Sequence, residues 1–249
     1  MASVSVVLTS CNRFDLLEKT LDSFFQYNTY PINQFIIIED SHNLLKLKNI
    51  LEKYHNVDFL VLSNTPQIGQ MKSIEKAYQH VSSDYIFHCE DDWEFFRSGF
   101  IEESLAILNS NKKIITVWLR EQNDTNSHPI ESKVYTVISN DKIKYQLLKV
   151  KHKRKSASLE WHGFTFNPGL RRVSDYQLIS PISDFKGERE LGEKYFQLGY
   201  RAAIVMKGYV KHIGFHRGIR YKVTNPKIVK DLSVYFRKVK TKLINKIRH

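Results

Sequence analysis

The sequence has little of what marks secreted and membrane-spanning proteins. Among its 249 residues there are only two cysteines, Cys11 and Cys89, too few for a disulfide framework, which favours a reducing compartment. No apolar run approaches the roughly 18 residues that a membrane span needs, and the N-terminus lacks the basic start of a signal peptide. These absences predict a cytoplasmic protein.

Two common nucleotide-binding motifs are also missing. No GxGxxG follows the first apolar run, which removes the best support for a Rossmann site that binds a dinucleotide or a methyl donor. No GxxxxGK[ST] occurs either, so the common phosphate-binding loop is absent. A nucleotide site would therefore have to be built from other groups.

The net charge of +12 is concentrated in two short segments. Residues 149–155 hold five Lys or Arg and no acid, and residues 227–249 hold eight against one acid, so the rest of the chain is neutral overall. Such segments fit an anionic partner, which could be a membrane surface or a nucleic acid. A nucleic-acid-binding protein with structural acids is thus one alternative, although no helix-turn-helix, zinc-ligand spacing or aromatic-basic sheet motif supports it.

The first ninety residues alternate between strand-like and helix-like patterns. Apolar, β-branched runs predict strands, and apolar residues at three- and four-residue spacing predict helices. The predicted strands are 3–9, 34–40, 57–64 and 84–89, and the predicted helices are 13–27, 44–54 and 69–81. Unbroken apolar strands between helices indicate an α/β fold with a mostly parallel sheet that is covered on both faces.

Beyond Phe95 the pattern is less regular. Helices are predicted over 100–110 and 188–200, and strand regions over 113–121 and 201–214, while the basic segment 149–155 is predicted to be a mobile connection. Asn225 and Pro226 can begin a last helix, in which apolar residues recur at helical spacing and basic residues fill the other face.

These patterns predict a single catalytic domain over 1–225 and a basic amphipathic helix over 226–249. Within the domain, 1–95 would bind a nucleotide and 96–225 an acceptor. The terminal helix could lie on an anionic membrane, pack on the domain or bind nucleic acid. We expect a protein that is peripheral on the inner face of a membrane, with no nucleic-acid partner.

Polar residues follow each predicted strand of the first half. Because the carboxyl ends of parallel strands meet at one edge of the sheet, we expect these residues to line a ligand crevice there. They occupy positions 9–12, 39–41, 63–64 and 90–92.

The last of these groups is the acidic run Glu90, Asp91 and Asp92 in "YIFHCEDDWEFF". Adjacent carboxylates repel unless something positive lies among them, and oxygen ligands suit Mg²⁺ or Mn²⁺. A metal held by one or two carboxylates completes its shell with water and substrate phosphates, which fits a nucleoside diphosphate. The alternative that this run is a solvated turn before the next helix stays open.

Four stretches of the chain, taken in order, resemble the landmarks of GT-A-fold inverting glycosyltransferases of the large family two. They are "VSVVLTSCNRFDLLEKTLDSF", "FIIIEDS", "DYIFHCEDDWEF" and "GERELGEKYFQLGYR", within residues 3–216. The "EDDWEF" variant is also similar to the Glu-Asp-Asp motif of animal N-acetylglucosaminyltransferases. The resemblance implies inverting transfer of a hexosyl or N-acetylhexosaminyl unit from a nucleotide-diphosphate sugar, expected to be UDP-linked, to a hydroxyl of a glycan or lipid-linked glycan, with Mn²⁺ or Mg²⁺.

The resemblance also implies roles in donor binding. Thr9 and Cys11 would contact the base and ribose, although some members have an aromatic ring where this chain has Cys11. Asp40 would accept a hydrogen bond from a uracil ring, Asp91 would hold the ribose or a metal-bound water, and Asp92 would be the direct metal ligand. Arg13 and Lys72 are further nucleotide-binding candidates, and a solvated helix lysine is the alternative for Lys72.

Roles in the transfer itself follow from the same resemblance. Glu188 would be the general base, where the family usually has Asp, with Glu190 as its companion; an ordinary acidic helix start is the alternative for both. His212 would approach the metal or diphosphate, or be structural. Trp161 and His162 are the candidates for acceptor binding. Three residues are minor candidates: Trp93 for sugar stacking or the core, and His216 and Arg217 for the diphosphate.

Overall fold

The computed structural model describes residues 1–152, 160–215 and 217. The fold and the site described below belong to the compact unit Met1–Ile213. The predicted helix over 226–249, the predicted boundary at 225, residues 153–155 of the basic segment and the candidate His216 lie outside the described residues. Within those residues, none of the helices combines the length and the apolar character that crossing a bilayer requires.

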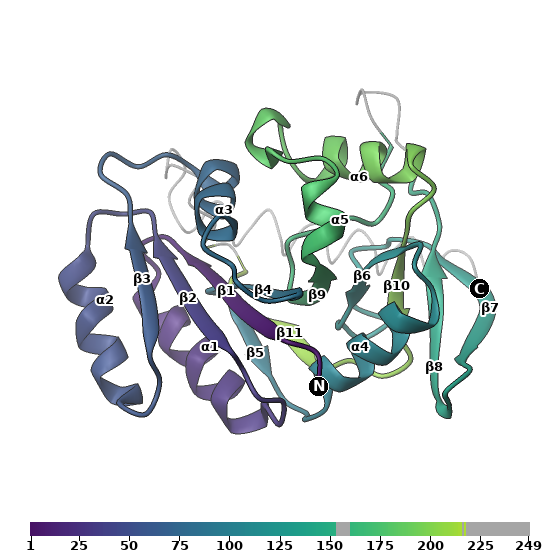
Figure 1. Cartoon of the computed structure of the whole chain (residues 1–249), viewed down its shortest axis with the longest axis horizontal. Coiled ribbons are helices and arrows are strands. Elements are labelled where there is room, and N and C mark those ends of the chain that lie inside the picture. Colours follow the sequence, from purple (N-terminus) through teal and green to yellow (C-terminus); the bar gives the residue numbers. More distant parts are fainter. Residues whose placement is uncertain (153–159, 216, 218–249) are drawn as a thin grey trace, which may run out of the picture. The chain divides into compact units, whose positions relative to one another are not determined.

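A five-stranded sheet forms the centre of the unit Met1–Ile213 (Figure 1). In spatial order it consists of β3 (Phe59–Ser63), β2 (Gln34–Glu39), β1 (Val4–Ser10), β4 (Tyr85–Glu90) and β9 (Gly169–Arg172). The first four strands are parallel, and β9 runs antiparallel along β4. The prediction of a mostly parallel α/β sheet is confirmed, whereas β9 was not predicted.

Helices cover both faces of this sheet because side chains alternate along each strand. On β1, Val6 packs into one core cluster and its neighbour Val7 into the other. The first face is covered by α1 (Phe14–Tyr27), α2 (Leu44–Leu51) and α4 (Phe100–Ser110), and the second by α3 (Gln70–Tyr78), α5 (Val173–Gln177) and α6 (Glu188–Gln197). Figure 1 shows the two sets of helices on opposite sides of the sheet.

Two smaller sheets complete the unit. In one, β6 (Ile114–Trp118), β10 (Arg201–Val205), β8 (Asn140–Leu148) and β7 (Ile130–Val137) lie side by side, and in the other β5 (Trp93–Phe95) pairs with β11 (Val210–His212). Short 3-10 turns lie at η1 (Glu52–Tyr54) and η2 (Ile182–Asp184). The β7–β8 hairpin was not predicted, because charged residues interrupt its apolar alternation.

The strand region predicted over 201–214 is divided between β10 and β11. Gly208 lies between them against the backbone of the loop after β6, where a Cβ would come within 2.5 Å of the Glu121 nitrogen. Only glycine permits this close approach without a shift of the loop. The division matters for the site, since it lets β11 carry His212 to the acidic run that precedes β5.

Candidate functional site

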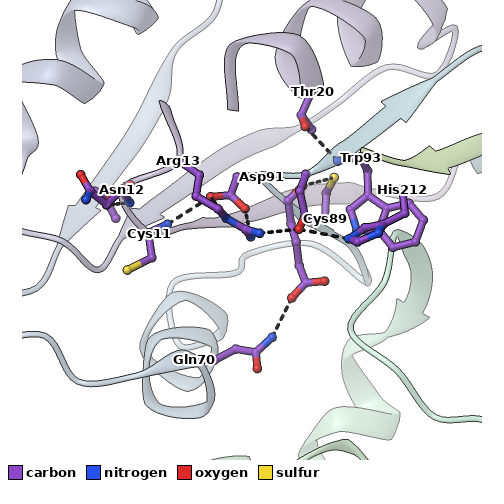
Figure 2. A network of polar contacts seen from close by, with 12 residues as sticks. Cys11, Asn12, Arg13, Thr20, Gln70, Cys89, Asp91, Trp93 and His212 are labelled. Atoms are coloured by element: carbon purple, nitrogen blue, oxygen red, sulfur yellow. Dashed lines mark hydrogen bonds and ion pairs between the residues drawn. The ribbon is translucent and has the colours of Figure 1, made fainter. Parts of the chain in front are cut away.

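The acids predicted to gather at the carboxyl edge of the sheet do lie there, at the end of β4. Asp91 is fully buried and Asp92 is 5% exposed, so the run is not a solvated turn. The backbone N–H of Cys11, from the loop after β1, donates to Asp91 Oδ2 at 3.2 Å. Figure 2 shows the network in which β1, β4 and β11 bring these groups together.

Arg13 supplies the positive charge that the adjacent carboxylates require. Its Nη1 donates to Asp92 Oδ2 at 2.5 Å, its Nε donates to Asp91 Oδ2 at 3.3 Å, and its Nη2 pairs with Asp91 Oδ1 (Figure 2). A planar guanidinium suits such a two-carboxylate contact. Burial raises the pKa of Asp91 to about 7, with Arg13 acting against this rise and Asp92 adding to it.

Asp92 and His212 are the pair that could hold a metal. His212 Nε2 lies 3.2 Å from Asp92 Oδ2, and Asp92 Oδ1 is buried without a hydrogen-bond partner among the described residues. Burial alone would raise the pKa of Asp92, but the hydrogen bond from His212 and the charge of Arg13 lower it. The described residues contain no group of three or more potential protein ligands. The pair therefore fits an ion that takes its remaining ligands from water and phosphate.

The end of β2 carries two acids with different surroundings. Asp40 accepts hydrogen bonds from the backbone N–H groups of Ile68 at 2.9 Å and Gly69 at 2.8 Å, and from the side chain of Asn64 at 2.9 Å. Both of its oxygens thus hold the loop that leads into α3. Glu39 is buried, and its Oε1 accepts from the Asn12 N–H, whereas its Oε2 has no partner among the described residues.

The remaining donor candidates differ in accessibility. Thr9 and Cys11 are half-buried at the end of β1, and Lys72 is exposed on α3. Burial, followed by the charges of Glu39 and Asp40, raises the pKa of Cys11 to about 12. Cys11 is therefore a neutral thiol at physiological pH, which suits a contact residue and not a nucleophile.

Glu188, in the second half of the unit, influences the acidic run electrostatically. Burial and the charges of Asp92 and Glu188 raise the pKa of Glu90 well above its usual range, so Glu188 acts on the acids across the site. Gln70, at the start of α3, donates to Glu90 Oε1 at 2.6 Å (Figure 2). Sequence reasoning assigned no individual role to Glu90, although it is the first acid of the run.

The start of α6 places Glu188 and Glu190 in different contacts. Glu188 Oε1 accepts from the Thr165 hydroxyl at 2.8 Å and from the Phe166 N–H at 2.6 Å. Glu190 Oε2 accepts from the Lys186 N–H at 2.6 Å, which ties the chain before α6 to its first turn. The two acids therefore have separate contacts.

Trp93 belongs to the core. It is 1% exposed and lies against the His212 ring, with a centroid distance of 5.0 Å. The Arg120 guanidinium lies 5.1 Å from its ring centroid. These contacts favour the core alternative over sugar stacking, and they give the ring a role in orienting His212.

The two acceptor candidates lie in the other half of the unit. Trp161 packs edge-to-face on His128, with a centroid distance of 4.8 Å, and donates to the Phe164 carbonyl at 2.9 Å. His162 is buried, with its Nε2 2.7 Å from Glu193 Oε2 on α6. Among the described residues, neither forms a hydrogen bond, an ion pair or a ring contact with the acidic run, so these contacts do not join them to the donor-side residues.

His128, which packs on Trp161, should make stability pH-dependent. Burial lowers its pKa to about 4, with Lys151 and His162 adding to this and the hydrogen bond to the Lys149 carbonyl opposing it. Because the folded pKa lies below the unfolded value of about 6.5, stability should be lost as the pH falls from 6.5 towards 4, by up to about 1.4 kcal/mol per pH unit.

The His128→Gln variant removes this titration and keeps a donor for the Lys149 carbonyl. We expect urea unfolding of this variant to show a shallower loss of stability between pH 6.5 and 4 than that of the unsubstituted protein. Equal slopes for the two proteins would contradict the assignment.

The sequence matches a known protein family. A family model described as glycosyl transferase family 2 matches residues 5–177. No curated protein matches the sequence.

Solved structures of glycosyltransferases share the fold at low sequence identity. A mannosyltransferase from Pyrobaculum calidifontis, solved with GDP-Man and Mn²⁺, aligns with a TM-score of 0.61 and 13% identity over 87% of this chain and 58% of its own. GalNAc-T7 with UDP, GalNAc and Mn²⁺ has a TM-score of 0.60 and 12% identity over 91% and 46%. S. aureus TarS 1-349 has a TM-score of 0.54 and 13% identity over 84% and 59%. The chain thus spans less than two thirds of each of these proteins.

Proposed function

The chain belongs to glycosyl transferase family 2 and is a glycosyltransferase of the GT-A fold, and from that premise we propose that it transfers a sugar from a nucleoside-diphosphate donor to an acceptor hydroxyl with inversion. The observation that supports this most strongly is the electrostatic influence of one acidic group on another from a distant part of the sequence. The run Glu90–Asp92 lies at the end of β4, and Glu188, which begins α6, adds to the rise in the pKa of Glu90.

The donor's nucleotide would lie over the carboxyl ends of β1 and β2. Thr9 and Cys11 border this edge, and Arg13 offers the cation nearest to a diphosphate. Asp40 holds the loop before α3 with both of its oxygens. Glu39, whose buried Oε2 has no hydrogen-bond partner among the residues that the structure describes, is therefore an added candidate for the nucleobase contact. The neighbours solved with GDP-Man and with UDP support a nucleoside diphosphate of either base, and UDP remains our expectation.

A divalent cation is the cofactor that we propose, and Asp92 and His212 would hold it. When bound, Mn²⁺ or Mg²⁺ would offset the charge of the leaving diphosphate. Support comes from Asp92 Oδ1, which has no hydrogen-bond partner in the described part of the chain, from the lowered pKa of Asp92 and from the Mn²⁺ in two of the structural neighbours.

Glu188 would act as the general base in the transfer. Inversion requires one carboxylate to take the proton of the acceptor hydroxyl while that oxygen attacks the anomeric carbon from the face opposite the diphosphate. Glu188 begins α6 and Asp92 lies between β4 and β5, so the two carboxylates come from separate parts of the fold. This separation suits a base and a metal ligand that act on opposite faces of the sugar. The hydrogen bonds from Thr165 and Phe166 would orient the carboxylate, with Glu190 supporting the start of the helix.

Isothermal titration with UDP, GDP and CDP tests this proposal. We expect one of them to bind only with Mn²⁺ present, and Asp92→Ala to weaken that binding about tenfold or more, because a charged ligand contact is lost. Lys48→Gln, an exposed change on α2, is the matched control. Failure of all three nucleotides to bind, with or without Mn²⁺, would overturn the proposal.

A membrane partner is proposed from the sequence pattern of residues 226–249. An apolar face opposite lysines and arginines suits an interface that carries anionic lipids, and a lipid-linked acceptor would be reached there. We expect deletion of residues 226–249 to abolish co-sedimentation with liposomes that contain anionic lipid. Binding that survives the deletion would exclude this segment as the membrane contact, and loss of stability without loss of binding would favour packing on the domain.

A further inference from the structure

A groove of about 500 Å³ lies in the second half of the unit Met1–Ile213, apart from the acidic run. Its described lining includes Lys149 after β8, His162, Phe196 on α6 and Arg201 at the start of β10. The volume is within the range of small-molecule sites, about 300–1,000 Å³. Neither the donor site nor the proposed transfer step uses it.

The groove combines cations with an aromatic surface. The Arg201 guanidinium lies 4.1 Å from the centroid of the Phe196 ring, and the His162 ring centroid lies 4.0 Å from the same point. Leu148 adds an apolar side chain to the lining. Because the His162 ring and the Arg201 guanidinium both lie against the Phe196 ring, the apolar contact for a sugar ring would come from Pro129 and Leu148.

The positive charges of the groove lack counter-ions within the described part of the chain. Arg201 is half-buried and donates to the Tyr200 carbonyl at 2.9 Å, but neither Arg201 nor Lys149 forms an ion pair among the residues that the structure describes. Glu193 is engaged by His162, and Glu131 is the one carboxylate of the lining. An arginine fork beside an aromatic ring is suited to a carboxylate or phosphate group.

We propose that this groove binds an acidic saccharide unit, a sugar ring that carries a carboxylate or a phosphate. The sugar ring would lie against the apolar lining of the groove, which includes Pro129 and Leu148, and the anionic group would be held by Arg201 and Lys149. Phe196 is eight residues after Glu188 on α6, about 12 Å along the helix axis. The groove would therefore bind one sugar unit of an extended acceptor, and that unit would be remote from the hydroxyl that reacts. This acceptor role rests on the proposed glycosyl transfer.

Ligand-observed NMR titration of the full chain, without nucleotide or metal, tests the binding directly. The probes are glucuronate, glucose 1-phosphate, glucose and inorganic phosphate. We expect glucuronate or glucose 1-phosphate to bind at least about tenfold more tightly than glucose and inorganic phosphate, because ring and anion are recognised together. Tighter binding of glucuronate would show that the anionic group of the ligand is a carboxylate. Tighter binding of glucose 1-phosphate would show that it is a phosphate.

Arg201→Gln should weaken the better acidic probe about tenfold, while Arg201→Lys should retain part of the affinity. Lys48→Gln removes one positive charge elsewhere and should change nothing. Equal affinity of the Arg201→Gln protein and the unsubstituted protein, or equal affinity for glucose and the acidic probes, would overturn the proposal. A thermal melt shows whether Arg201→Gln is folded; if it is not, Lys149→Gln replaces it, with weaker binding of the acidic probe expected.

The outcome is separable from that of the donor titration. If the protein binds an acidic saccharide but no nucleotide, the groove is still a saccharide site and the proposal of glycosyl transfer fails. If the protein binds a nucleotide in a metal-dependent way but no acidic saccharide, the proposal of a transferase site stands and the proposal of a saccharide site in the groove fails.

Discussion

Glu188→Gln should lower the rate of sugar transfer about 100- to 10,000-fold, the range for loss of a general base. The amide keeps an oxygen that can accept from the Thr165 hydroxyl and the Phe166 N–H, so the start of α6 should remain in place. Donor binding should change less than about threefold, since the substituted group would act on the acceptor. The rate is measured as release of nucleoside diphosphate from the donor that the titration identifies, with acceptor or with water as the attacking group.

Glu52→Gln is the matched control for this substitution. Glu52 is exposed in the 3-10 turn after α2, and the same chemical change there should leave the rate unchanged. A Glu188→Gln protein that keeps a third or more of the rate would exclude Glu188 as the base. Joint loss of donor binding and rate would instead indicate that Glu188 contributes to the donor site.

Arg13→Gln should shift metal and donor affinity in opposite directions. In the structure the Arg13 guanidinium contacts both Asp91 and Asp92, so a metal that binds Asp92 has to compete with it. Without the guanidinium, we expect Mn²⁺ alone to bind ten- to a hundredfold more tightly, because each charge-assisted hydrogen bond that has to be broken costs on the order of 1.5–3 kcal/mol. Donor affinity should fall about tenfold, since the nearest cation for the diphosphate is gone.

Electron paramagnetic resonance of free Mn²⁺, without nucleotide, measures the first effect, and titration with nucleoside diphosphate measures the second. The measurement belongs at pH 8, where Asp91, with a pKa of about 7, is ionised in the unsubstituted protein; loss of Arg13 raises this pKa, so a second measurement of both proteins at higher pH accompanies it. Arg13→Lys should lie between the two proteins, because an ammonium keeps the charge but cannot contact both carboxylates as a fork. Unchanged Mn²⁺ affinity in Arg13→Gln would show that Arg13 does not compete for the metal site.

The elements that could be predicted from sequence are those whose local pattern matches their burial. The strands β1, β2 and β4 are mostly apolar and mostly buried, and α1 has Leu17, Leu21 and Phe24 at helical spacing, so the local patterns of these elements predicted them correctly. The β7–β8 hairpin is mostly exposed on its first strand and carries charged residues, so it has little apolar alternation to detect. The strand β9 is four residues long and pairs with β4, in pairs that run from Tyr85–Arg172 to His88–Gly169, and no local pattern predicts so distant a contact.

The candidate site divides in the same way. Strand ends placed the acids Asp91 and Asp92 at the sheet edge, because parallel strands align their carboxyl ends regardless of the rest of the fold. The contacts of Arg13 with both acids, the hydrogen bonds of Asp40 to the α3 loop and the lack of a partner for Glu39 Oε2 within the described residues depend on side-chain directions. They could not be deduced from residue spacing.

The sequence by itself determined the α/β class, the acidic edge of the sheet and the concentration of positive charge in two segments, because periodicity, strand ends and composition are local properties. Only the tertiary structure decided which distant residues meet. It brought His212 to Asp92 through the β5–β11 pair, Glu188 towards Glu90 through the start of α6, and Arg201 onto Phe196 in the groove. Such contacts arise from the packing of elements far apart along the chain, and their geometry exists only once the core has formed.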